Sequence, residues 1–76
     1  MDKLEFTPCM ETVNFWKETF KKENRDLKEE IDDVKGTISN ERLFQKGSNT
    51  DEEVIMHEQN IVDNLEYLQW LEEQVG

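Results

Sequence analysis

Apolar residues in the first half of the chain recur at alternating spacings of four and three. The series comprises Phe6, Met10, Val13, Lys17, Phe20, Asn24, Leu27, Ile31, Val34 and Ile38, and eight of its ten members are apolar. This alternation is the period of a coiled-coil seam. Lys17 and Asn24 interrupt it. Polar residues at such positions either fix register and oligomeric state or mark places where the helix is exposed.

The first series predicts a helix over about residues 8–35. Thr7 can cap this helix, and Pro8 suits its first position, where a missing N–H costs nothing. Gly36 is a suitable stop signal. Residues 36–49 then form a connector, with a possible short helix at 39–45 and a turn at 46–49.

A second helix is predicted over about residues 50–74. Thr50 followed three residues later by Glu53 is a capping-box pattern, and acids in the first turn suit the positive end of the helix dipole. The four–three alternation returns in this helix at Val54, Glu58, Ile61, Leu65, Leu68, Glu72 and Val75.

These elements predict an all-α fold: an antiparallel helical hairpin of two long amphipathic helices with a coiled-coil-like seam, as a single domain over residues 1–76. Such a hairpin brings Trp16 and Phe20 against the C-terminal half of the second helix. Each helix of a hairpin buries one face, so we expect a homodimer that forms a four-helix bundle. The residues expected to carry self-association are Val13, Phe20, Asn24, Leu27, Ile31, Val34, Ile61, Leu65 and Leu68.

Composition narrows the possible chemistry. The 76 residues include a single cysteine, Cys9, and a single histidine, His57, so neither an intramolecular disulfide nor a Cys/His zinc site is expected. No cofactor is indicated. There is no run of about 20 apolar residues and no signal-peptide pattern, so we expect a cytoplasmic protein that does not bind membranes.

The charge is large and one-sided. The formal net charge is −10, and all nine Lys and Arg residues lie in the first 46 positions beside eleven acids, which gives 9 − 11 = −2 there. The remaining 30 residues carry eight acids and no Lys or Arg, hence −8. Direct binding of nucleic acid is not expected, because phosphate contacts need clustered Lys and Arg.

The acidic residues have two interpretations. They either form a solvated face that keeps a small protein soluble, or they bind the basic surface of a partner protein. Acids three or four apart on a helix recur at about 5 Å along its axis, comparable to the roughly 3.4 Å between phosphates of one DNA strand. The candidate residues are Asp51, Glu52, Glu58, Asp63, Glu66, Glu72 and Glu73, extended by Glu29 and Asp33 of the first helix.

Four aromatic residues are candidate anchors for a partner: Phe15, Trp16, Tyr67 and Trp70. Tyr and Trp bury a large area and keep a polar group, although packing within the bundle is their commoner role. We expect Phe15 and Trp70 to be the most exposed. His57 could form a pH- or metal-dependent pair with Glu53, one turn earlier, or be a solvated histidine.

No catalytic motif or phosphate-binding loop is present, so we expect a protein that is not an enzyme. The leading hypothesis is a regulator or inhibitor that mimics DNA and docks on a basic, nucleic-acid-binding enzyme. In general character the chain resembles the small inhibitors that phages and mobile elements use against such enzymes, although no motif carries this resemblance. The alternative is a structural or adaptor coiled-coil subunit that binds a partner helix through its apolar seam.

Overall fold

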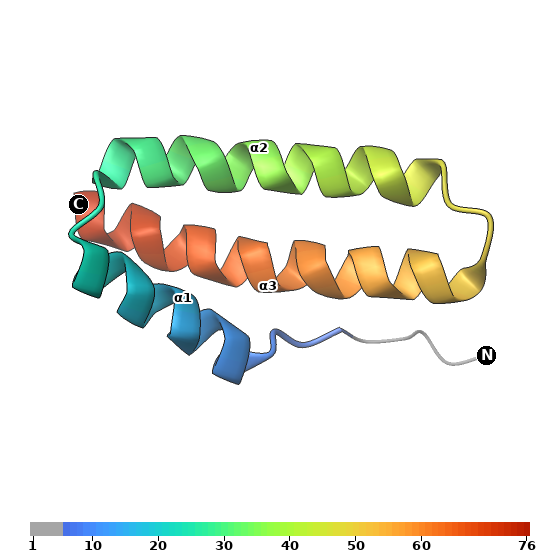
Figure 1. The fold of residues 1–76 in the computed structure, drawn as a ribbon, viewed down its shortest axis with the longest axis horizontal. Coiled ribbons are helices and arrows are strands. Elements are labelled where there is room, and N and C mark those ends of the chain that lie inside the picture. Colours follow the sequence, from blue (N-terminus) through green and yellow to red (C-terminus); the bar gives the residue numbers. More distant parts are fainter. Residues whose placement is uncertain (1–5) are drawn as a thin grey trace.

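The computed structural model describes residues 6–76 and is all-helical there (Figure 1). Three helices follow one another: α1 at Met10–Glu23, α2 at Leu27–Lys46 and α3 at Asp51–Val75. The all-α prediction is therefore confirmed, whereas the prediction of two helices is wrong. None of the three helices is long and apolar enough to cross a membrane.

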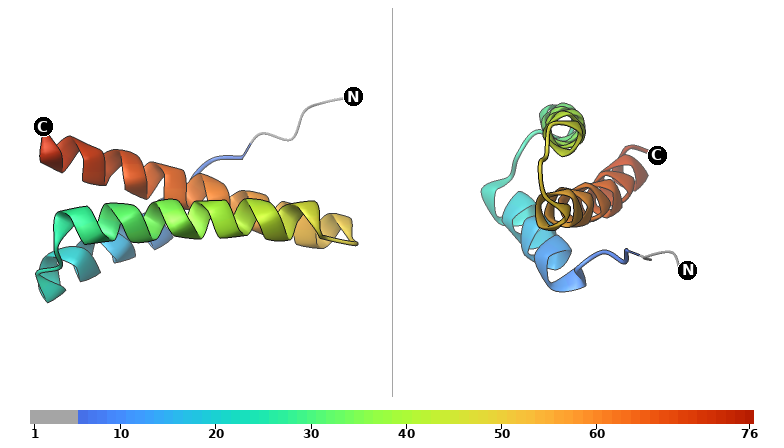
Figure 2. Two further views of the ribbon diagram at one scale, coloured as in Figure 1. Left: turned by 90° about the horizontal axis from the view of Figure 1, so that it is seen from above. Right: turned by 90° about the vertical axis from the view of Figure 1, so that its right-hand side faces the viewer.

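The three helices are arranged around α3. Helix α2 runs antiparallel to α3, while α1 runs in the same general direction as α3 along its C-terminal half (Figure 1). Both α1 and α2 pack on α3, and no close backbone approach joins α1 to α2. Seen end-on, α1 and α2 lie at different positions around the α3 axis (Figure 2).

The predicted helix over 8–35 is broken by a chain reversal at residues 24–26. Asn24 has left-handed backbone angles (φ 54°, ψ 46°) and ends α1. Asparagine tolerates this conformation better than most residues because its short polar side chain can hydrogen-bond locally. Asp26 then starts α2, since its side chain accepts a 3.0 Å hydrogen bond from the Glu29 N–H. Asn24 is therefore a helix-ending residue and no part of a seam.

Gly36 lies inside α2 and does not end a helix. Helix α2 continues to Lys46, so the prediction that the chain leaves the helix at Gly36 is wrong. The possible helix at 39–45 lies within α2, and the turn predicted at 46–49 nearly coincides with the reversal at residues 47–50. A mid-helix glycine costs about 1 kcal/mol relative to alanine. Val34 and Ile38, which flank Gly36 and are both buried, stabilise the helix across it.

The start of α3 is as predicted. The Thr50 side chain accepts a 3.2 Å hydrogen bond from the Glu53 N–H, and Glu53 Oε2 accepts one of 3.3 Å from the Asn49 N–H. These bonds satisfy backbone donors that have no partner within the helix.

The core lies where α1 and α2 meet α3. It consists of the buried residues Val13, Val34, Ile38, Ile61, Tyr67 and Leu71, against which Trp16, Phe20, Leu27, Ile31, Leu68 and Trp70 pack. Most of the residues predicted to associate between copies thus pack within one chain. Leu65 and Asn24 differ, because both are exposed.

Candidate partner-binding groove

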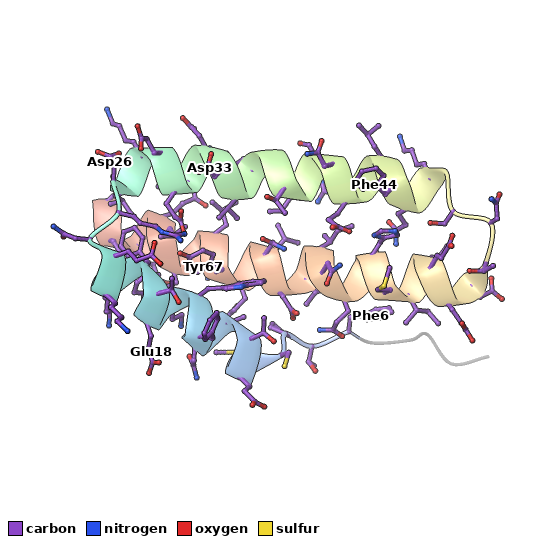
Figure 3. The ribbon with its side chains drawn as sticks, viewed as in Figure 1. Phe6, Glu18, Asp26, Asp33, Phe44 and Tyr67 are labelled. Carbon is purple, nitrogen blue, oxygen red and sulfur yellow. The ribbon has the colours of Figure 1, made fainter. Side chains whose placement is uncertain are left out.

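A groove of about 550 Å³ lies between α1 and α2, with α3 as its floor. Figure 3 labels two of the residues that line it, Asp33 on α2 and Tyr67 on α3. Its position follows from the fold, because α1 and α2 both pack on α3 without closing on each other. We refer to it as the α1–α2 groove. The lining residues come from all three helices and are Phe15, Trp16, Thr19, Arg25, Glu30, Asp33, Val34, Thr37, Glu41, Asn60, Asn64 and Tyr67.

The α2 wall of the groove is acidic. Glu30, Asp33, Thr37 and Glu41 are three to four residues apart, so they share one face of the helix. Glu30 is buried, Glu41 is half-buried and Asp33 is exposed. The wall therefore presents one buried, one half-buried and one exposed carboxylate.

The α1 wall is aromatic. Phe15 is 64% exposed. Trp16 is half-buried and packs on Tyr67, with ring centroids 5.6 Å apart and planes tilted by 50°. This wall offers a large apolar surface held in place by a ring contact.

The α3 floor is polar. Asn64 is buried, and its Nδ2 donates a 2.7 Å hydrogen bond to the carbonyl oxygen of Asn60 one turn earlier. Both asparagines lie between the acidic and aromatic walls. Their side chains offer donors and acceptors at the base of the groove.

One end of the groove is closed by three linked side chains. Tyr67 donates a 2.5 Å hydrogen bond from its hydroxyl to Glu30 Oε2, and Arg25 Nη1 donates to the same oxygen at 3.2 Å. Arg25 also contacts Glu23 Oε1 through Nη2 at 2.8 Å. The pKa of Tyr67 is raised by burial first, then by the hydrogen bond to Glu30 and by the negative charge of Glu30. The Tyr67 hydroxyl therefore stays protonated at neutral pH. Hydrogen bonding to Glu23 raises the pKa of Arg25, which remains a cation.

At the other end a histidine pairs with the acidic wall. His57 Nδ1 lies 2.5 Å from Glu41 Oε2, and its ring stacks on Phe44 with centroids 5.9 Å apart. The predicted pairing with Glu53 within α3 is not the one that His57 makes. The adjacent Gln45 Nε2 donates a 2.8 Å hydrogen bond to Glu58, which further ties α2 to α3.

A second, smaller cavity of about 340 Å³ adjoins the groove at the start of α2. Arg25, Asp26, Glu29, Glu30 and Asp33 line it. Three of these residues, Arg25, Glu30 and Asp33, also line the groove. Carboxylates thus continue from the acidic wall around the beginning of α2.

The predicted acidic face is divided by the fold. Asp63 is 5% exposed and is therefore not available to a partner. Its Oδ1 accepts hydrogen bonds of 2.7 Å from the Cys9 N–H and 2.8 Å from Gln59 Nε2, because α1 starts directly against α3 at this point. Glu58 and Glu66 are half-buried, and the other predicted acids are exposed, namely Glu29, Asp33, Asp51, Glu52, Glu72 and Glu73.

The predicted aromatic anchors are divided as well. Phe15 is exposed as expected, and it lines the groove with Trp16 and Tyr67. Tyr67 is 3% exposed and belongs to the core. Trp70 is half-buried, because Phe20 packs edge-on against it at 5.8 Å and the ammonium groups of Lys17 and Lys21 lie over it at 5.5 and 5.6 Å. The expectation that Trp70 is among the most exposed aromatics is therefore wrong.

Several groove residues were missed by the sequence analysis: Thr19, Arg25, Thr37, Glu41, Asn60 and Asn64. The spacing of Glu30, Asp33, Thr37 and Glu41 gave a usable signal, since it places four polar side chains on one helical face. Nothing in the sequence indicated that α1 lies opposite these four residues, because the position of α1 depends on the chain reversal at Asn24.

Cys9 is exposed at the start of α1. Hydrogen bonding to Thr12, whose Oγ1 lies 3.4 Å from the sulfur, lowers the pKa of the Cys9 thiol. Among residues 6–76 no three His, Cys, Asp or Glu side chains are grouped so as to hold a metal ion.

Comparison with protein-family models, with curated proteins and with solved structures found no match to the chain.

Proposed function

We propose that this protein is a non-catalytic regulator that binds a basic surface of a partner protein, with a nucleic-acid-binding enzyme as the class of partner. The observation that carries the proposal is the α1–α2 groove, in which exposed Asp33 and half-buried Glu41 face the aromatic side chains of Phe15 and Trp16. Carboxylates opposite an aromatic wall suit cationic side chains, which gain ion pairs on one side and cation–π contacts on the other.

The charge distribution supports this proposal. Residues 47–76, which contain all of α3, hold eight acids and no Lys or Arg. At the beginning of α2, Asp26, Glu29 and Asp33 add exposed carboxylates beside the groove. A field of one sign attracts an oppositely charged partner over about 10 Å at moderate salt.

We favour a binding role over catalysis because two of the three groove carboxylates, those of Glu30 and Glu41, are engaged in structural contacts. Glu30 accepts hydrogen bonds from Tyr67 and Arg25, and Glu41 pairs with His57. A general acid or base needs a free path to a reacting atom. These groups instead join helices to one another, which favours recognition over catalysis.

The test is capture of partners from a lysate by the immobilised protein, followed by elution in two steps. Short duplex DNA is applied first and high salt second. If the acids occupy a phosphate-binding site, nucleic-acid-binding proteins should elute with DNA. Bound proteins that resist both DNA and moderate salt would contradict the proposal, since a charged interface weakens as ionic strength rises.

Two bait variants give matched controls on one helix. Glu29→Gln with Asp33→Asn removes two exposed negative charges from α2, and Lys28→Gln with Lys35→Gln removes two exposed positive charges from the same helix. The first variant should lose DNA-eluted partners. The second should retain them. Equal loss with both variants would point to a disturbed helix and not to an acidic interface.

A second candidate function, a structural or adaptor subunit that self-associates, is favoured by the loop end of the α2–α3 pair. Leu43, Ile55 and Met56 are exposed there. Arg42 and Lys46 of α2 lie at the same end as the acids that begin α3. In a two-fold dimer, α2 of one copy would lie beside α3 of the other. The basic residues Arg42 and Lys46 would then pair with the acidic residues at the start of the other copy's α3.

Sedimentation equilibrium tests this second function. A dimer should form in the wild-type protein and be lost in Leu43→Ser with Ile55→Ser. A monomer at every concentration would contradict it.

A further inference from the structure

We infer that the α1–α2 groove is a receptor for one amphipathic helix of a partner, whose arginine-bearing face lies along the acidic wall. This inference rests on the proposed function and names the element of the partner that would be recognised. It is argued from the space that the groove offers, from its charge and from its aromatic wall.

The space corresponds to a missing helix. Helices α1 and α2 flank α3 without close approach to each other, which is three-quarters of a four-helix arrangement. Glu30 and Glu41 are eleven positions apart on α2, or about 16 Å at 1.5 Å per residue. That length matches about three turns of an occupying helix.

The charge along this length favours a cation. Arg25 stands at the closed end, where Glu23 and Glu30 engage it. Further along the wall, Asp33 is exposed and Glu41 is half-buried beside His57. Arginines along one face of the partner helix would therefore meet the carboxylates of Glu30, Asp33 and Glu41, which lie three and eight residues apart on the facing wall.

The aromatic wall favours arginine over lysine. Phe15 is 64% exposed and lines the groove from α1, and Trp16 is held against Tyr67. A planar guanidinium can stack on such rings while it donates to a carboxylate, whereas an ammonium acts as a point charge. Apolar side chains of the partner helix would cover the remainder of Phe15.

A second copy of this chain is the alternative occupant. Helix α2 carries Lys28, Lys35, Arg42 and Lys46 at spacings of seven, seven and four, which form a basic stripe on one helical face. Two copies nevertheless repel each other through a net charge of −10 each. The partner helix is therefore the better occupant, and self-docking is an outcome that the experiment detects.

The experiment uses the full chain and a defined probe. The probe is a fluorescein-labelled alanine-based helical peptide with arginines at positions i, i+4, i+7 and i+11 and leucines beside them. Its matched control replaces each arginine by glutamine. Fluorescence anisotropy gives the Kd, and amide chemical shifts of the labelled protein locate the peptide. The expected result is binding of the arginine peptide, with shift changes along the groove at residues 15–19, 33–41 and 60–64.

Variants at exposed positions give the decisive comparison. Asp33→Asn should weaken the Kd about threefold, and Phe15→Ser should weaken it about tenfold. Asp32→Asn and Leu43→Ser are the matched controls, because both residues are exposed on α2 and neither lines the groove. The controls should bind as the wild-type protein does.

Five outcomes would overturn the inference. Equal weakening by Asp32→Asn and Asp33→Asn would show diffuse attraction, and equal binding of the glutamine peptide would remove the role of charge. No binding at millimolar peptide would exclude the helix. Oligomers that vanish in Lys35→Glu would assign the groove to a second copy. If Phe15→Ser and Asp33→Asn lose the peptide but still capture DNA-eluted partners, the inference fails while the proposed function stands.

Discussion

The hydroxyl of Tyr67 donates a 2.5 Å hydrogen bond to the carboxylate of Glu30, although the two residues are 37 positions apart. Glu30 is 8% exposed, so its negative charge is held largely away from water. Burial of a carboxylate is costly unless it is paired and hydrogen-bonded. Here Arg25 supplies the opposite charge and Tyr67 the second donor. The contact joins α2 to α3 and fixes the closed end of the α1–α2 groove.

The first prediction concerns this hydrogen bond. Tyr67→Phe keeps the ring that packs on Trp16 and removes the donor to Glu30. The free energy of unfolding in urea should fall by about 1–3 kcal/mol, since a buried carboxylate loses one partner. In a protein that already carries Glu30→Gln, Tyr67→Phe should lower the free energy of unfolding by less. A double-mutant cycle measures this difference. Additive effects would contradict a coupled pair.

The second prediction concerns alkaline pH. Tyr67 is the only tyrosine, so tyrosinate absorbance reports it directly. Burial and the Glu30 contact raise its pKa in the folded state above the ordinary value of 10.0. Above pH 10 the unfolded chain therefore releases a proton that the folded chain retains, and stability falls as pH rises. The stability difference between wild-type protein and Tyr67→Phe should shrink by about 1.4 kcal/mol per pH unit there. A folded protein that forms tyrosinate with an ordinary midpoint would contradict this.

The parts of the fold that depend on local signals could be predicted from the sequence. Thr50 and Glu53 form the predicted cap, and α3 has nearly the predicted length. The expected proximity of Trp16 and Phe20 to the C-terminal half of α3 is also observed. It arises because α1 runs alongside α3 after the reversal at Asn24, and not through an antiparallel hairpin.

The parts that depend on the chain reversal could not be predicted. The four–three alternation passes through Asn24 without a gap, so periodicity alone favours one continuous helix. The helix is nevertheless interrupted, because Asn24 adopts a left-handed conformation that ends α1 and Asp26 caps the start of α2. Once the helix is broken, α1 lies opposite α2, and the groove between them follows. Likewise, the burial of Glu30 and Asp63 depends on partners far along the chain, Tyr67 and Cys9.

The third prediction tests whether Gly36 is a helical residue. Its φ is negative, and a Cβ added there would meet no atom within 4 Å. Gly36→Ala should therefore raise the free energy of unfolding by about 0.5–1 kcal/mol, because alanine loses less backbone entropy. Gly47→Ala, after the end of α2, is the control and should be close to neutral, since its Cβ would make ordinary contacts. A destabilised Gly36→Ala would mean that the chain needs a positive φ at this position, as the predicted helix end required.

The fourth prediction tests the reversal at Asn24. Because φ at Asn24 is 54°, glycine is favoured at this position and alanine is disfavoured. Asn24→Gly should therefore be more stable than the wild-type protein, and Asn24→Ala should be less stable. The two variants should differ by about 1 kcal/mol in urea unfolding. Asn40→Ala is the control, because Asn40 is exposed within α2, where alanine is the better helix former. If Asn24→Ala matched the wild type, α1 and α2 would be able to form one helix.

The fifth prediction concerns the anchor of α1. Cys9 begins the helix without a side-chain cap of its own, and Asp63 of α3 instead accepts its backbone N–H at 2.7 Å. Gln59, which donates to both Asp63 and the Thr7 carbonyl, extends this contact to the preceding segment. Asp63→Ala should lower stability by about 1–2 kcal/mol, because a donor loses its acceptor at a buried position.

Amide hydrogen exchange distinguishes a local effect from a global one. In Asp63→Ala the first turn of α1 should lose protection before α2 and α3 do, since α1 meets the rest of the chain through α3. Asp63→Asn should retain more protection than Asp63→Ala, because its amide oxygen can still accept from Cys9. Asp32→Ala, at an exposed site of α2, controls for the loss of one charge. Uniform loss of protection across all three helices would show that α1 is not separately anchored, and the groove would then open only when the whole protein unfolds.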